Sequence, residues 1–61
     1  MKAQIGNTIK IIHLNGEDST YDGKTGIITH IDGMGQLHGT WGGLAVIPEK
    51  DNFTVLKKAQ Q

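Results

Sequence analysis

Three histidines are the side chains of this 61-residue chain best suited to chemistry, because an imidazole can act as a base or bind a metal ion. His30 and His38 flank a predicted turn and would face each other across a hairpin, with Cβ atoms roughly 4.5 to 5.5 Å apart. Such a pair could share one metal ion. A zinc site needs three or four protein ligands, and without cysteine the third ligand would be His13 or a loop carboxylate. We therefore expect His30 and His38 to face solvent, with no metal or other cofactor bound.

The residue types of a nucleophilic triad also occur, as Ser19, His13 and either Asp18 or Asp22. Catalysis by such a set needs the base within hydrogen-bond reach of the nucleophile and an oxyanion hole inside a cleft. A domain of this size offers little cleft. The glycine pair within residues 33–35 is no phosphate loop, because it joins two predicted strands and lacks both a following helix and a Lys-Ser/Thr pair. We expect no enzymatic activity.

Composition indicates one small folded domain over residues 1–61, with a core over about 4–57 and a polar tail over 58–61. Hydrophobic residues make up 36% of the chain and charged residues 20%, which is typical of globular proteins. Six lysines balance six acidic residues and arginine is absent, so no charge excess attracts a polyanion. The chain has neither a signal-peptide pattern nor an apolar run of membrane-spanning length. We expect a cytoplasmic protein.

The spacing of apolar residues predicts an all-β protein, because they alternate between glycine-containing turns and no long window has helical spacing. In the third predicted strand, Leu37, Gly39 and Trp41 would point inward, with Ile31 opposite Leu37 across the preceding hairpin. The predicted strands cover residues 8–14, 25–31, 36–41, 44–47 and 53–56; the connections are a loop over 15–24, tight turns over 32–35 and 42–43, and a 3₁₀ turn over 49–52.

Five short strands with one long loop after the first predict a small five-stranded SH3-like barrel. An OB-fold has five strands as well, but it usually needs a longer chain and a helix between the third and fourth strands. The gap between residues 41 and 44 leaves no room for that helix. The SH3-like barrel is therefore the architecture that we expect.

Two resemblances follow from the placed strands. The string of residues 23–32 resembles the start of KOW-type segments, in which a glycine opens a strand of small and apolar residues. A longer pattern resembles the bacterial and phage family called domain of unknown function 4314, which implies a small β-barrel encoded in chromosomes or mobile elements and implies no reaction. The residues that carry this longer pattern are Ile5, Gly6, residues 9–13, Gly26, Ile28, Ile31, Asp32, Gly35, Gln36, His38, Trp41, Leu44, Ile47, Pro48, Asp51 and Phe53.

The aromatic and acidic residues suggest a surface for a partner. Trp41 and Phe53 are expected in the core, because so small a core needs its largest side chains. Tyr21 lies in the long loop and either contacts a ligand or anchors that loop. Acidic residues in the same loop would repel phosphate and suit a basic or proline-containing peptide. The predicted contact residues are Glu17, Asp18 and Tyr21, flanked by His30, His38 and Thr40.

The most plausible partner is thus another protein. The alternative is a KOW-like accessory protein of a phage or mobile element that binds nucleic acid. A third hypothesis is self-association, because five short strands leave exposed edges that can pair between copies. The sequence is compatible with a monomer or with a weak homodimer.

Overall fold

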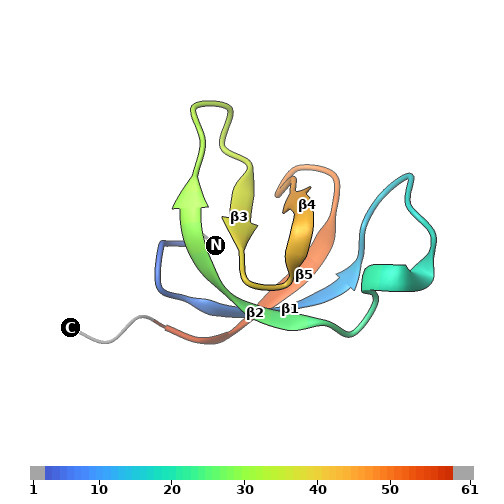
Figure 1. The fold of residues 1–61 in the computed structure, drawn as a ribbon, viewed down its shortest axis with the longest axis horizontal. Helices are drawn as coiled ribbons and strands as arrows, with labels where there is room; N and C mark the ends of the chain where they lie inside the picture. The colour runs from blue at the N-terminus through green and yellow to red at the C-terminus, as the bar shows by residue number, and fades with distance from the viewer. Residues whose placement is uncertain (1–2, 59–61) are drawn as a thin grey trace.

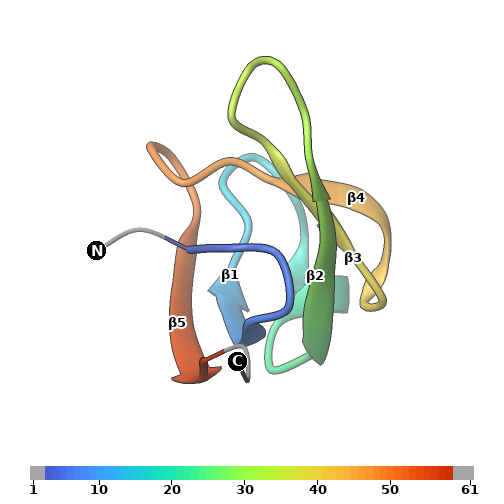
Figure 2. The ribbon, with the colours of Figure 1, turned by 90° about the vertical axis from the view of Figure 1, so that its left-hand side faces the viewer.

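The computed structural model describes residues 3–58 and contains a single sheet of five antiparallel strands (Figure 1). The strands are β1 (Thr8–His13), β2 (Thr25–Ile31), β3 (Leu37–Gly39), β4 (Gly42–Val46) and β5 (Asn52–Lys57), and a short 3₁₀ helix, η1 (Ser19–Tyr21), lies between β1 and β2. Their order in the sheet is β4-β3-β2-β1-β5. The sheet curves strongly around its core (Figure 2). Within residues 3–58, the edge strands β4 and β5 do not pair with each other, so the sheet is open.

The all-β prediction is confirmed, and the second strand has the predicted bounds. The hairpin register is also confirmed, because Ile31 pairs with Leu37 and His30 pairs with His38. The first strand ends one residue earlier than predicted, and β5 extends beyond both predicted ends. The third strand is shorter than residues 36–41. The predicted polar tail is described only at Lys58; residues 59–61 lie outside the described residues.

The 3₁₀ turn predicted over residues 49–52 lies closer to the N-terminus and is not a 3₁₀ helix, because Asn52 already belongs to β5. Residues 48–51 instead form a turn in which the Ile47 carbonyl accepts from the backbone N–H groups of Lys50 and Asp51, at 3.0 and 2.8 Å. The 3₁₀ helix is η1, in the long loop, where the Asp18 side chain caps its first turn. This cap explains why a 3₁₀ helix forms in the long loop, since a carboxylate that accepts backbone N–H bonds stabilises a helical turn at its N-terminus.

The predicted turn at residues 42–43 is wrong. Gly42 and Gly43 begin β4, and the turn consists of Thr40 and Trp41 between the paired residues Gly39 and Gly42. The indole explains this shift. With Trp41 in the turn, its ring folds back over Gly39 into the core, and its Nε1–H donates to the Leu44 carbonyl at 2.8 Å.

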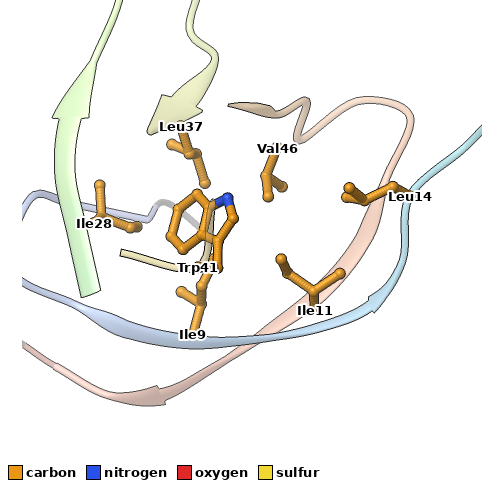
Figure 3. Packing of buried hydrophobic residues seen from close by; sticks show 7 residues of the cluster. All are labelled: Ile9, Ile11, Leu14, Ile28, Leu37, Trp41 and Val46. Carbon is orange, nitrogen blue, oxygen red and sulfur yellow. The ribbon is translucent and has the colours of Figure 1, made fainter. Parts of the chain in front are cut away.

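Seven buried side chains form the core, and all five strands contribute to it or pack against it. Alternation places Ile9 and Ile11 of β1 inside and Ile12 outside, as a half-buried strand requires. Trp41 lies in the middle of the cluster (Figure 3), and Phe53 packs against it from β5. The buried residues are Ile9, Ile11, Leu14, Ile28, Leu37, Trp41 and Val46.

Candidate binding surface

The long loop, residues 14–24, begins with a turn of its own and is hydrogen-bonded to β1 at its C-terminal end. Near its start, the backbone N–H of Glu17 donates to the Leu14 carbonyl at 3.1 Å. At its end, Ile11 exchanges backbone bonds with the loop: Gly23 N–H donates to the Ile11 carbonyl at 2.7 Å, and Ile11 N–H donates to the Lys24 carbonyl at 2.8 Å. The bonds to Ile11 fix the end of the loop on β1, and the rest of the loop, with η1, projects from that end of the sheet (Figure 1).

The acidic side chains of the long loop differ in what they contact. Asp18 Oδ1 accepts from the backbone N–H of Thr20 at 3.0 Å and from its hydroxyl at 2.6 Å. These two hydrogen bonds, the hydroxyl bond first, lower the pKa of Asp18, because they favour the charged form. Asp22 Oδ1 accepts from His13 Nδ1 at 2.9 Å. Glu17 is exposed and has no ion-pair partner within residues 3–58, so it is the unengaged carboxylate of this loop.

Tyr21 joins the long loop to β4. Its side chain is half-buried and packs against the core cluster. The ring lies directly on Gly42, where an added Cβ would come within 2.7 Å of the Tyr21 hydroxyl oxygen. The Lys24 ammonium lies 5.7 Å from the ring centroid. These contacts describe a loop anchor; a ligand contact through the remaining exposed part of Tyr21 stays a prediction.

Thr40 lies two residues from Gly42 and makes a structural contact. Its hydroxyl oxygen accepts from the backbone N–H of Ile27 at 3.0 Å, and its own N–H donates to the Ile27 carbonyl at 3.1 Å. Thr40 therefore ties the β3–β4 turn to β2. Thr40 is exposed, as predicted, but its hydroxyl is already engaged in the hydrogen bond with Ile27.

His30 and His38 form the predicted cross-strand pair, with ring centroids 5.7 Å apart and planes inclined by 40°. His38 Nε2 donates to Asp32 Oδ2 at 3.0 Å, and Asp32 Oδ1 accepts from the backbone N–H groups of Met34 and Gln36 at 2.9 Å each. The hydrogen bond from His38 is the largest cause that lowers the pKa of Asp32, followed by that from Gln36. Within residues 3–58, no three potential metal ligands gather around one point.

Asp32 was not among the predicted contact residues. Its position at the start of the β2–β3 turn was a usable signal, since aspartate at a turn commonly accepts from backbone N–H groups two residues on. The His38 contact needed the hairpin register as well, because it joins a turn residue to a strand residue across the ladder.

The structure divides the predicted contact residues into two groups. Glu17, Asp18 and Tyr21 belong to the long loop, which Tyr21 links to the β3–β4 turn near Thr40. His30 and His38 lie at the β2–β3 turn. Ile27, the partner of Thr40, precedes His30 by three residues, or about 10 Å at roughly 3.3 Å per residue along a strand. The two groups are therefore separate patches.

A hollow that the sequence did not reveal lies between the start of the long loop and β4. Its volume is about 230 Å³, and it is bordered by Leu14, Asn15, Glu17, Leu44, Ala45 and Ile47. A second hollow of about 200 Å³ lies beside Pro48, Phe53 and Val55. Asp51 borders both hollows, but its two carboxylate oxygens already accept from the backbone N–H groups of Asn15 and Ile47, at 2.7 Å each.

These observations define an all-β protein of five antiparallel strands, with polar patches and hollows around its loops and edges. Residues 2–56 match the family described as Domain of unknown function (DUF4314), so the chain belongs to that family, which confirms the resemblance. Neither a curated protein nor a solved structure matches the chain. None of the helical structure in residues 3–58 is long and apolar enough to cross a membrane.

Proposed function

We propose that the chain is a small, non-catalytic binding module of the cytoplasm whose partner is another protein, contacted through the long loop. The observation that carries this proposal is the ordered loop itself: its C-terminal end is hydrogen-bonded to Ile11 of β1, and Glu17 and Asp18 are exposed on it. A surface that is already ordered loses less conformational entropy when it binds. Acidic side chains on such a surface favour a partner with lysine or arginine at the contact.

An SH3-like barrel is the architecture that we infer for this open sheet. The strand order β4-β3-β2-β1-β5 and the strong curvature of the sheet support it, as does the single core that the sheet wraps. The long loop follows the first strand, which is where small barrels of this kind commonly bind peptides beside an aromatic side chain. Tyr21 supplies the aromatic residue at that place.

Binding of nucleic acid is the competing hypothesis, and it comes from the KOW-like string at residues 23–32. The balance of six lysines against six acidic residues and the absence of arginine disfavour it. The charge of the long loop disfavours it as well, because the ionised Asp18 and the unpaired Glu17 would repel phosphate.

Site-specific photocrosslinking in the cells that encode the protein tests the proposal. A photoreactive residue replaces Ser19, which is exposed in η1, and in a matched control it replaces Met34, which is 85% exposed at the β2–β3 turn. We expect a protein adduct from position 19 that is absent from position 34. Equal adducts at both positions would argue against the long loop.

A second experiment tests whether the protein binds nucleic acid. Isotope-labelled protein is titrated with a mixed pool of short single-stranded RNA and DNA, and its amide spectrum is recorded at low and high salt. We expect no shifts. Amide shifts that follow one surface and disappear as the salt concentration rises would replace the protein partner with a nucleic acid, because phosphate contacts release counterions.

A further inference from the structure

The sheet has two unpaired edges, and they differ in charge. Within residues 3–58, β4 pairs only with β3, and β5 pairs only with β1. An edge strand is a template for another strand unless proline, charged side chains or a covering segment protects it. Gly42–Val46 contains neither proline nor a charged residue, whereas β5 ends in Lys57 and is followed by Lys58. The Leu44 carbonyl of β4 already accepts from Trp41 Nε1. In charge and proline content β4 is nevertheless the less protected edge, and β5 would repel a basic segment.

We propose that β4 is the edge at which the partner docks: an extended, lysine-bearing segment of the partner protein adds to β4 as a further strand. One apolar side chain of that segment enters the hollow beside β4, and a lysine reaches Glu17 at its rim. This inference rests on the proposed function, since it assumes a protein partner. It adds the docking edge and the chemistry of the segment that docks there.

The hollow has the size and lining for one side chain. Leu44, Ala45 and Ile47 supply apolar surface, and Asn15, Glu17 and Gln36 supply polar surface, to an open space of about 230 Å³. A closed cavity of roughly 150 Å³ holds benzene, so the volume of this open hollow is sufficient for one aliphatic side chain. The hollow is bordered by β4 itself, so a side chain of an added strand lies within reach of it. Strand addition supplies affinity through the main chain, and such a pocket for an alternate side chain supplies selectivity.

The charge at the rim selects lysine. Glu17 borders the hollow and has no ion-pair partner in the described part of the chain. Asp51, the other carboxylate at the hollow, already accepts from Asn15 and Ile47. Lys24, the cation of the long loop, lies over the ring of Tyr21. Glu17 is thus the carboxylate left for a cation that arrives with a partner.

The test is a titration of isotope-labelled protein with three pools of short capped peptides, followed by amide spectra. In the first pool, lysine alternates with a random choice of valine, leucine, isoleucine or threonine. The second pool has glutamate in place of lysine, and the third has proline in place of alternate apolar residues, which removes main-chain donors. We expect the first pool alone to shift the amides of residues 14–17 and 42–47.

Two variants sharpen the result. Glu17→Gln should raise the Kd for the lysine pool roughly two- to fivefold, the size of one exposed ion pair. Glu49→Gln, in the turn after β4, is the matched control because Glu49 does not border the hollow, and it should leave the Kd unchanged.

Several results would overturn the inference: no shifts with the lysine pool, shifts that follow β5, or an equal response to the glutamate or proline pools. Shifts of the β4 amides on dilution without any peptide would also overturn it, since they would assign this edge to a second copy of the chain. A protein adduct at position 19 combined with silent β4 amides would leave the proposed function standing and remove the docking edge.

Discussion

The two turns at the ends of β3 are built on opposite principles. The β2–β3 turn is exposed, and the carboxylate of Asp32 organises it by accepting from Met34, Gln36 and His38. The β3–β4 turn places Trp41 in the core, where the indole packs on Gly39 and donates to the Leu44 carbonyl at 2.8 Å. The first turn is held by groups close in sequence, and the second is held by the tertiary structure.

This difference predicts how far the effect of a substitution in each turn extends through the fold. Loss of a contact in the polar turn exposes groups that water can satisfy, so the effect should stay local. Loss of the indole leaves a cavity in a core of seven buried side chains, and every strand that packs there is affected. Substitutions at matched positions of the two turns can therefore separate local from global stabilisation.

The largest expected effect is that of Trp41→Ala. A tryptophan-to-alanine change in a core costs about 3 to 5 kcal/mol, while a domain of this size is stable by only about 3 to 9 kcal/mol at roughly 0.05 to 0.15 kcal/mol per residue. We expect a largely unfolded or strongly destabilised protein in urea titrations followed by far-UV circular dichroism. Met34→Ala is the control in the other turn, and it should change the unfolding free energy by less than about 0.5 kcal/mol. Similar losses for both variants would contradict the contrast between the turns.

The next effect is that of Gly39→Ala. A Cβ at this position would overlap the Ile27 carbonyl and the Trp41 ring, neither of which can move freely. We expect a loss of about 1 to 3 kcal/mol from overpacking, measured by the same urea titration. Gly33→Ala is the matched substitution in the polar turn, where an added Cβ meets nothing within 4 Å, and it should be nearly neutral. If Gly39→Ala destabilised the protein no more than Gly33→Ala, this would contradict the close packing of the Trp41 ring on Gly39.

The smallest effect concerns pH. The pKa of Asp32 is lowered in the folded protein, chiefly by the hydrogen bond from His38. Its carboxylate therefore stabilises the fold above the unfolded pKa of about 3.9, and this contribution is lost as the pH falls through the lower folded pKa. We expect the melting temperature of the wild type to fall more steeply than that of Asp32→Asn as the pH drops from about 5 to about 2. Parallel curves would show that Asp32 contributes nothing to the polar turn.

Much of the fold was accessible from sequence, because alternation and turn chemistry are local. Leu37 and Trp41 were placed inside by their spacing, and the turn before Gln36 was placed by its aspartate and glycines, with Gly35 at a φ of 83°. The pairing of His30 with His38 followed from that turn alone. The contact between His38 and Asp32 was missed, because turn chemistry does not report which strand side chain reaches back to the turn.

The second turn could not be located in the same way. Two adjacent glycines favour a turn, but Gly42 is needed where Tyr21 lies against the backbone, at a φ of 150°. Its role is thus to accommodate a side chain from a loop about twenty residues earlier, which no local pattern records. The separation of the predicted contact residues into two patches has a similar origin. Thr40 is hydrogen-bonded to Ile27 in the first half of β2, whereas His30 lies near the end of that strand.

The sequence by itself determined the strand class, the approximate positions of all five strands, the register of the β2–β3 hairpin and most of the core. Each of these depends on residues that are close along the chain or that alternate with period two. Only the tertiary structure decided the position of the β3–β4 turn, which two strands form the open edges, and the hollow beside Glu17. The turn depends on how Trp41 and Tyr21 pack against glycines of the sheet. The edges depend on the order of the strands, and the hollow depends on how the long loop lies beside β4, so all three are properties of the assembled fold.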